Sequence, residues 1–435
     1  MIFNIIGLCI LLYSLARFRK GLILFLIYKI VLVQNITLIS IPGIPLLTLD
    51  DFMTIAILVI YAFKRKKLRR TKQSFPFRNP FILFAVSWLL SSLFAAAGFG
   101  AEITRFIRNI TGNLLLIVLI WEQIDKEEDF KRLYRGITIL VFISCIYGLI
   151  EYMLGRNPIV EYEATLISDA ERVINYSYDT VGRGYRIQSF FEHCIGAGMS
   201  WAMYFSFVIT KVVKGKKQLP YHKLSVLTAA LCIPCIILTK MRSPLLFLIL
   251  CSLLFIDFKR RKFYSLAIVG VFGLIIIFPM ITENINILLS FFSRDAQNSI
   301  SGSNLNMRLE QFQTALQVVK SSPLIGFGEK YRNVLDRFAI RKLYGLESIW
   351  LSSLVMYGFI GVITNIIMAY YSIVIIPKVK KCPNARILAV AYWVVASLTS
   401  TPGFNMFLYY ILYFFFLKEI RTKEDLVFEN GKKEM

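Results

Sequence analysis

The stretch YRGITILVFISCIYGLIEYML, residues 134–154, decides the fold class of this chain. A helix rises about 1.5 Å per residue, so a helix of this length would cross the roughly 30 Å of a bilayer's hydrocarbon core. A segment in lipid must satisfy its own backbone hydrogen bonds, and a helix does so. The stretch therefore predicts a transmembrane helix.

Similar apolar blocks recur along the whole chain, separated by short basic runs. Of the 435 residues 57% are hydrophobic, and the mean hydropathy is +0.62, which is more apolar surface than a soluble domain of this length could hide. We therefore expect an all-α integral membrane protein with about 13 (12–14) transmembrane helices. The predicted spans are residues 2–16, 21–40, 46–63, 80–97, 106–121, 134–154, 191–210, 224–239, 244–256, 263–281, 348–376, 387–400 and 404–417.

The basic residues lie on alternate connections between these blocks. One set, which begins with Arg17–Lys20 and ends with the tail from Lys418, carries 33 Lys and Arg residues. The short connections of the other set carry 4. The positive-inside rule makes the first set cytoplasmic, so we expect the N-terminus outside and the C-terminus in the cytoplasm. Topology thus accounts for the net charge of +23, and we expect no nucleic-acid partner.

Two long connections fall on the predicted outer side. The larger contains Leu305, Leu309, Phe312, Leu316 and Val319, whose spacing of three and four residues predicts an amphipathic helix that ends before Pro323. The predicted organisation is N-terminal membrane helices (1–154), a first extracytoplasmic loop (155–190), central membrane helices (191–281), a large extracytoplasmic loop (282–347), C-terminal membrane helices (348–418) and a cytoplasmic tail (419–435).

Several arginines gather at the predicted outer face, with few acidic residues to pair with them. Singly, each could be a lipid-headgroup anchor or a solvated residue. Arginine keeps its charge when buried, and its planar fork matches phosphate oxygens. Together they predict a site for an anionic ligand such as a lipid-linked diphosphate, without a metal ion or cofactor. The candidates are Arg105, Arg183, Arg186, Arg242 and Arg308.

Three stretches around these residues resemble the O-antigen polymerase and O-antigen ligase superfamily of bacterial membrane glycosyltransferases. The first is Arg186-Ile-Gln-Ser-Phe-Phe-Glu-His193, and the second is Thr239-Lys-Met-Arg242-Ser243, with methionine where the family usually has serine. The third joins Arg308 and Pro323-Leu-Ile-Gly-Phe-Gly328 to Glu347. Ligases of the superfamily usually have a histidine at the position of Glu347, so the resemblance favours the polymerase branch.

The resemblance implies a glycosyltransferase in the bacterial cytoplasmic (inner) membrane. Its donor would be a polyprenyl-diphosphate-linked glycan, and its product O-antigen, capsule or exopolysaccharide. The five arginines would bind the diphosphate, Glu347 is the first candidate for the general base, and His193 is the second. Membrane lipids and a chain-length-determining protein are the other candidate partners. Tyrosines of the first loop could stack on sugar rings: Tyr162, Tyr176, Tyr178 and Tyr185.

Two other functions stay open. An O-antigen ligase would transfer finished polymer to lipid A-core, using the same class of donor. A flippase or other transporter of lipid-linked oligosaccharides is less favoured, because the two halves of the chain show no repeat and the polar residues gather at the outer face instead of the membrane midplane.

Overall fold

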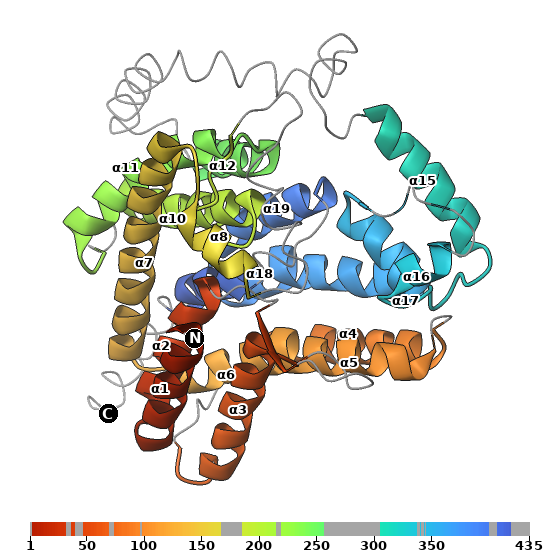
Figure 1. Cartoon of the computed structure of the whole chain (residues 1–435), viewed down its shortest axis with the longest axis horizontal. Coiled ribbons are helices and arrows are strands. Elements are labelled where there is room, and N and C mark those ends of the chain that lie inside the picture. Colours follow the sequence, from red (N-terminus) through yellow and green to blue (C-terminus); the bar gives the residue numbers. More distant parts are fainter. Residues whose placement is uncertain are drawn as a thin grey trace, which may run out of the picture. The chain divides into compact units, whose positions relative to one another are not determined.

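The computed structural model describes residues 2–31, 36–39, 47–68, 74–95, 98–166, 185–214, 219–255, 305–336, 340, 343, 345–399 and 407–418. The chain divides into two compact units. The first comprises Met1–Arg65 and Glu127–Arg308, and the second Lys66–Lys126 and Leu309–Met435. The described residues of both units are almost entirely helical, as the sequence predicts (Figure 1).

In the first unit a long helix, α7, packs against α2 on one side and α11 on another. The helices α10, α11 and α12 pack on one another, and are drawn in green in Figure 1. The elements are α1 (Ile2–Ala16), α2 (Phe18–Val31), β1 (Thr37–Ile39), β2 (Leu47–Thr48), α3 (Leu49–Lys64), α7 (Glu127–Leu154), α8 (Pro158–Ala164), α10 (Cys194–Lys214), α11 (His222–Leu238) and α12 (Arg242–Phe255).

The core of this unit joins α10 to α7 through large side chains with satisfied polar tips. Trp201 is fully buried, and its indole donates to Ser144 Oγ at 2.8 Å. Tyr204 is also fully buried, and its hydroxyl donates to Thr138 Oγ1 at 3.0 Å. Both aromatic residues lie on α10 and both partners on α7, so packing and hydrogen bonding fix the register of the two helices.

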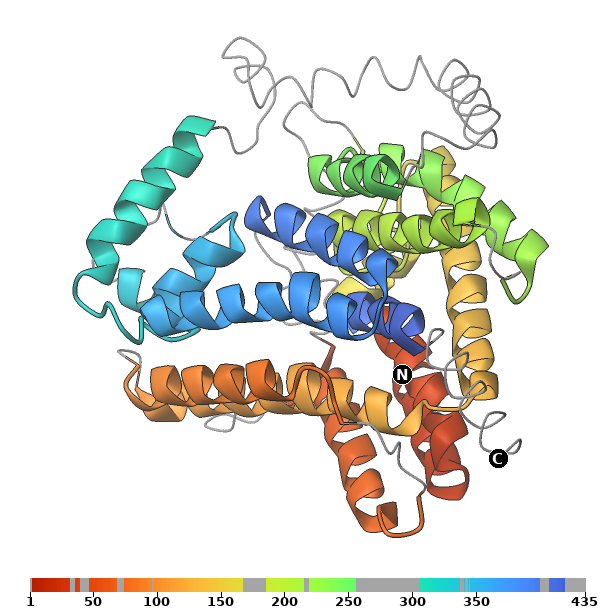
Figure 2. The ribbon, with the colours of Figure 1, turned by 180° about the vertical axis from the view of Figure 1, so that it is seen from behind.

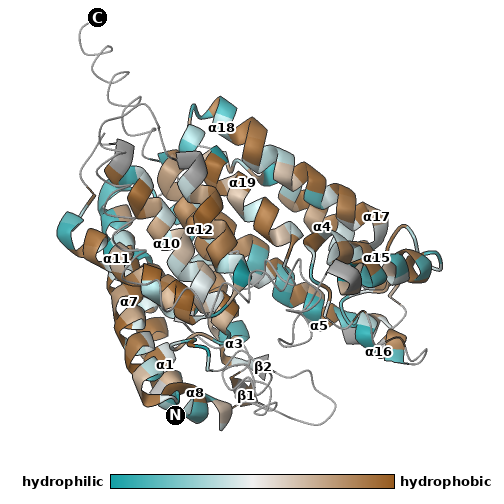
Figure 3. Cartoon of the chain, turned by 90° about the horizontal axis from the view of Figure 1, so that it is seen from above, coloured by the Kyte–Doolittle hydropathy of each residue, from teal (hydrophilic) through white to brown (hydrophobic). Residues whose placement is uncertain are grey.

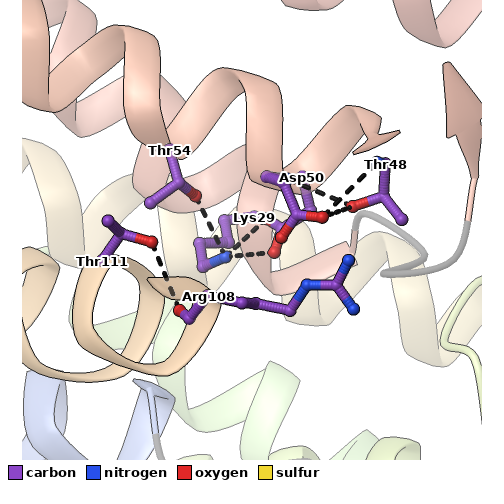
Figure 4. A network of polar contacts seen from close by, with 7 residues as sticks. Lys29, Thr48, Asp50, Thr54, Arg108 and Thr111 are labelled. Atoms are coloured by element: carbon purple, nitrogen blue, oxygen red, sulfur yellow. Dashed lines mark hydrogen bonds and ion pairs between the residues drawn. The ribbon is translucent and has the colours of Figure 1, made fainter. Parts of the chain in front are cut away.

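The first turn of α3 contains two adjacent acidic residues, Asp50 and Asp51, which could suggest a metal site. Asp51 and Thr48 form a reciprocal capping box at the helix N-terminus. Asp50 pairs with Lys29 of α2, whose ammonium lies 2.6 Å from Oδ2 and 3.5 Å from Thr54 Oγ1. Figure 4 shows this network, together with the bond from the Thr111 hydroxyl to the backbone carbonyl of Arg108. The two carboxylates therefore have structural roles.

A short antiparallel hairpin departs from the all-helical prediction. β1 pairs with β2, and Thr37 lies opposite Thr48. The predicted transmembrane spans 21–40 and 46–63 had placed both segments in helices. The β-branched residues Thr37 and Ile39 favour extended backbone, and here they outweigh the apolar character that suggested a longer helix. α2 accordingly ends earlier than predicted.

In the second unit α4 lies alongside both α5 and α17, as both ribbon views show (Figure 2). The elements are α4 (Arg78–Leu93), α5 (Phe99–Asn109), the π-helix η1 (Ile110–Leu115), α6 (Leu116–Gln123), α15 (Leu305–Val319, assigned to this unit from Leu309), α16 (Tyr331–Asp336), α17 (Ile349–Tyr370), the π-helix η3 (Tyr371–Ile375), α18 (Ile376–Val379), α19 (Pro383–Ser397) and a last helix, Phe407–Lys418.

Within the described part of the chain, three continuous helices are long and apolar enough to cross a membrane: Glu102–Gln123, Glu127–Leu154 and Ile349–Val379. Figure 3 shows α7 and α17 coloured as hydrophobic along most of their length. Helices also overlap the other predicted spans, apart from residues 263–281, which lie outside the described residues. The membrane-protein class is confirmed, while the number of crossings stays a prediction.

The helix predicted in the large loop is present as α15, but its predicted apolar stripe is only partly buried. Leu309, Phe312 and Leu316 are exposed, whereas Val319 of the stripe and the adjacent Ala315 are buried. These two residues join a hydrophobic cluster with residues of α16 and α17. The buried face is therefore rotated away from the three bulkier residues of the stripe.

Candidate functional site

The segment before α10 is held in the first unit by one buried carboxylate. Glu151, at the end of α7, accepts the backbone N–H of Gln188 at 3.1 Å and that of Ser189 at 2.6 Å. It also accepts the hydroxyl of Tyr185 at 2.8 Å. Three donors on one carboxylate satisfy a charge that burial would otherwise penalise. Glu151 thereby fixes the backbone on both sides of Arg186.

Arg186 lies against the turn that carries Arg242. Its Nη1 is 3.7 Å from the sulfur of Met241, and the neighbouring N–H of Ile187 donates to the Leu238 carbonyl at 3.3 Å. Arg186 is 8% exposed, and Arg242 is half-buried as the first residue of α12. The structure therefore places Arg186 in contact with the residue that precedes Arg242, another of the arginines that the sequence singled out.

Close packing holds that turn in place. A Cβ on Gly198 of α10 would lie 2.6 Å from Cγ of Pro244 and 3.2 Å from Cγ2 of Thr239, so only glycine lets the two segments approach this closely. Lys240 adopts a positive φ of 52°, which turns the chain sharply between α11 and α12. Close packing and the sharp backbone turn therefore restrict the movement of the segment that carries Arg242.

His193 caps α10. Its Nδ1 accepts the backbone N–H of Ile195 at 2.9 Å, and its side chain is 8% exposed. A ring that accepts at Nδ1 carries its proton on Nε2 when it is neutral. In this arrangement Nε2 is a hydrogen-bond donor and Nδ1 is engaged in the cap, which suits a structural role better than a general base.

Glu163 of α8 is a carboxyl group that sequence reasoning missed. It is 1% exposed, and its Oε2 makes no hydrogen bond to any residue that the structure describes. Burial, and then the negative charge of Glu192, raise the pKa of Glu163 to about 8. Its hydrophilic neighbours in the chain, Glu161 and Tyr162, gave no sign of this burial.

In the second unit the end of the large loop docks into a break in α17. The break lies at Gly358, which has a φ of 63° and a ψ of −160°. The N–H groups of Phe327 and Gly328 donate to carbonyls of residues 355 and 356, and those of residues 359 and 360 donate to carbonyls of Pro323 and Leu324. The loop therefore satisfies backbone groups that the break leaves without helical partners.

This docking places Glu329, a second carboxylate that sequence reasoning missed. Its Oε1 accepts hydrogen bonds from the Tyr357 hydroxyl and from the Asn109 amide. Glu102 accepts the backbone N–H groups of Glu329, at 3.1 Å, and of Lys330, at 2.8 Å. Loss of solvent raises the pKa of Glu329 above its usual value, although the positive charge of Arg105 opposes this shift.

The remaining predicted site residues are distributed over several elements. Arg105 is an exposed residue of α5, and Glu347 is half-buried, two residues before α17 begins. Arg308 lies in the first turn of α15 and is half-buried. Arg183, Tyr176 and Tyr178 lie outside the described residues, while Tyr162 is exposed. Convergence of all these residues on one ligand stays a prediction.

These features define an all-helical integral membrane protein with an arginine-bearing turn and a loop that is built into a broken helix. Residues 227–366 match the family model of O-antigen ligase. This region carries the chain's relationship to the O-antigen polymerase and ligase superfamily, and it contains Arg242, Arg308, Glu329 and Glu347. No functionally curated protein matches the chain.

Proposed function

We propose that the protein polymerises polyprenyl-diphosphate-linked oligosaccharide repeat units at the outer face of the bacterial cytoplasmic membrane. The observation that carries this proposal is the contact of Arg186 with Met241, in the turn that also carries Arg242. This turn lies within residues 227–366, the region that matches the O-antigen ligase family. Two guanidinium groups on a rigid support suit a ligand with two phosphates. The orientation with the N-terminus outside and the C-terminus in the cytoplasm belongs to the same proposal.

In the proposed reaction an acceptor hydroxyl of one lipid-linked unit attacks the anomeric carbon of another. The new glycosidic C–O bond forms as the bond from that carbon to the diphosphate breaks, and the electron pair leaves on the diphosphate. Arg186, Arg242 and Arg308 stabilise the charge that develops there, with Arg183 and Arg105 as further contributors. Glu347 accepts the hydroxyl proton. No metal ion or cofactor is required by this scheme.

Glu347 is preferred to His193 as the base for a geometric reason. The Nδ1 of His193 is committed to the α10 cap, which leaves a protonated Nε2 in the neutral ring. Glu347 precedes a long apolar helix and is half-buried, so its carboxylate is partly desolvated and near a helix N-terminus. A carboxylate in place of the ligases' histidine also favours the polymerase branch.

The arginine turn can be tested with variants in a deletion strain. Arg242→Ala and Arg186→Ala should abolish polymer on gels of surface glycans while the protein still accumulates in the membrane. Lys240→Ala is the matched control, because it removes a positive charge from the same turn, and it should leave polymer length near normal. Normal polymer length in both arginine variants would contradict the diphosphate site.

Ligation to lipid A-core is the second candidate function, and the description of the matching family favours it. Analysis of surface glycans in the deletion strain separates the two functions. Loss of a polymerase should leave a single repeat unit on the core, whereas loss of a ligase should leave the core without any repeat. A bare core would replace the polymerase proposal with the ligase.

A further inference from the structure

The second unit contains a partly open cavity, of whose lining the proposed reaction scheme uses only Arg105. Its volume is about 330 Å³, at the lower end of the roughly 300–1,000 Å³ that is typical of small-molecule sites. Residues of α4, α5, α17, α19 and the last helix line it. A single water occupies about 30 Å³ in the liquid, so the cavity has room for a ligand rather than for one bridging water.

Aromatic side chains form much of the cavity wall. Trp88, Trp393, Tyr392 and Tyr409 all line it, and the last two stack with ring centroids 4.1 Å apart. Flat aromatic faces pack well against the C–H face of a sugar ring, while a small number of polar groups fixes its orientation. The wall therefore offers the mixture of surfaces that carbohydrate binding requires.

Polar groups lie in the same wall. The carboxylate of Glu329 is held there by Tyr357 and Asn109, and Arg105 lines the cavity without an ion pair to any described residue. Ser352 and Asn113 contribute a hydroxyl and an amide. A purely hydrocarbon ligand would leave these groups desolvated without compensation.

The clearest sign of a missing ligand is the hydroxyl of Tyr409. Tyr409 is 2% exposed, and its hydroxyl makes no hydrogen bond of good geometry to any residue that the structure describes, although the hydroxyl of Ser372 lies nearby. The Ser372 hydroxyl accepts from Trp393 at 2.8 Å and donates its proton to the Ala369 carbonyl at 3.0 Å, so it can offer Tyr409 only its second lone pair. An unpaired hydroxyl in a buried place costs about 1–3 kcal/mol, which a bound ligand could recover.

Two departures from regular helix contribute to the wall. Asn113 belongs to the π-helix η1, and Ser372 belongs to the π-helix η3. π-helical segments are rare and occur frequently at functional sites, because they are retained despite their poorer hydrogen-bond geometry. Their presence on two different elements of one cavity supports a binding role.

We propose that this cavity binds one pyranose ring of the lipid-linked glycan, with the ring against the Trp and Tyr side chains and its hydroxyls paired to Glu329 and to the Tyr409 hydroxyl. This inference rests on the proposed function, and it names the sugar itself, rather than its diphosphate or lipid, as the ligand of the second unit.

Binding can be measured with sugar that carries neither phosphate nor lipid. The probe is the oligosaccharide released by mild acid from lipid-linked repeat units of the deletion strain, titrated against the full-length protein in lipid nanodiscs and followed by tryptophan fluorescence. Tyr409→Phe should weaken binding by about tenfold, as expected for one lost buried hydrogen bond. The same variant should change thermal stability little, because the Tyr409 hydroxyl makes no hydrogen bond of good geometry to the described residues.

Tyr413→Phe is the matched control on the same helix. Its hydroxyl donates to the Ser372 carbonyl at 2.7 Å and does not line the cavity, so its removal should lower thermal stability and leave sugar affinity within about twofold. Ser352→Phe, which fills the cavity, should abolish sugar binding while the protein stays folded.

Three results would overturn the assignment: no binding of the oligosaccharide to the wild type, equal binding by Tyr409→Phe, or retained binding by Ser352→Phe. Farnesyl phosphate serves as a lipid probe, and a loss of its binding in these variants with unchanged sugar binding would reassign the cavity to lipid. Failure of the proposed function would give a different pair of results. Deletion of the gene would leave polymer length unchanged, while the protein would still bind the sugar in a Tyr409-dependent way.

Discussion

The hydroxyl of Tyr357 donates a hydrogen bond to Oε1 of Glu329, which joins the residue before the break in α17 to the residue after the docked loop. The contact exists because Gly326 and Gly358 let two stretches of backbone meet. A Cβ on Gly326 would lie 2.5 Å from the carbonyl carbon of Met356, and a Cβ on Gly358 would lie 2.4 Å from that of Leu324. Both glycines also have positive φ angles.

Alanine at either of these glycines should therefore destabilise the protein. The strained backbone alone costs about 1–3 kcal/mol, and the steric clash with backbone atoms adds to it. We expect Gly358→Ala and Gly326→Ala to lower the melting temperature in detergent by several degrees and to reduce the amount of folded protein. Gly345→Ala is the control, because no atom lies within 4 Å of the added Cβ. Equal stability of all three variants would contradict the docked arrangement.

Glu151→Gln should weaken the support of Arg186. The amide nitrogen of glutamine cannot accept a hydrogen bond, so at least one of the N–H groups of Gln188 and Ser189 would lose its partner. A lost bond to a charged acceptor costs about 1.5–3 kcal/mol. We expect a lower melting temperature and shorter polymer, whereas Glu128→Gln, on the same helix with a side chain that is 75% exposed, should change neither. Wild-type polymer length in Glu151→Gln would show that this support is dispensable.

Stability should fall as the pH rises from about 4.5 to about 8, because of Glu163. Its pKa in the folded protein is about 8, above that of an unfolded chain, so the unfolded state releases this proton first. The glutamine side chain of Glu163→Gln does not titrate, so it makes no such contribution to the pH dependence of stability. The variant should melt at least about 3 °C above the wild type at pH 8, with the difference shrinking toward pH 4.5. A difference that does not depend on pH would mean that Glu163 is ionised when buried, and Glu161→Gln controls for general charge effects.

His193→Asn distinguishes a helix cap from a chemical role. Asparagine is a good N-cap, so its side-chain oxygen can accept the Ile195 N–H as the ring does. If Glu347 is the base, this variant should keep both stability and polymer formation, whereas His193→Ala should lose about 1 kcal/mol of stability. Loss of polymer in a stable His193→Asn protein would assign the proton transfer to the histidine.

The sequence predicts features that depend on local pattern. α7 ends at Leu154, as the span 134–154 predicts, and begins seven residues earlier, at Glu127, because two polar turns precede the apolar block. A helix, α15, is also present where the periodicity predicts one. The contact of Arg186 with the turn of Arg242 joins the first two motifs of the family resemblance, while the convergence of the five arginines stays a prediction. These features were accessible because apolar periodicity and charge placement act over a few helical turns.

Other features depend on contacts between distant parts of the chain. Glu329 acquires its place only when residues 323–328 dock at a break more than twenty residues later, and no local pattern marks a loop glutamate for this role. The face that α15 buries was predicted only in part, because Val319 of the stripe is buried together with Ala315, whereas Leu309, Phe312 and Leu316 are exposed. Glu163 was missed because its burial depends on what covers α8.

The docked residues 323–328 also limit how the loop before them can move. Residues 323–328 share backbone hydrogen bonds with both halves of α17, so they cannot swing away without unfolding part of a membrane helix. Any rearrangement of the preceding loop while α17 stays folded must pivot on the N-terminal side of Pro323. Residues 323–328 thus anchor the loop to α17, and a hinge for loop movement would lie N-terminal to them.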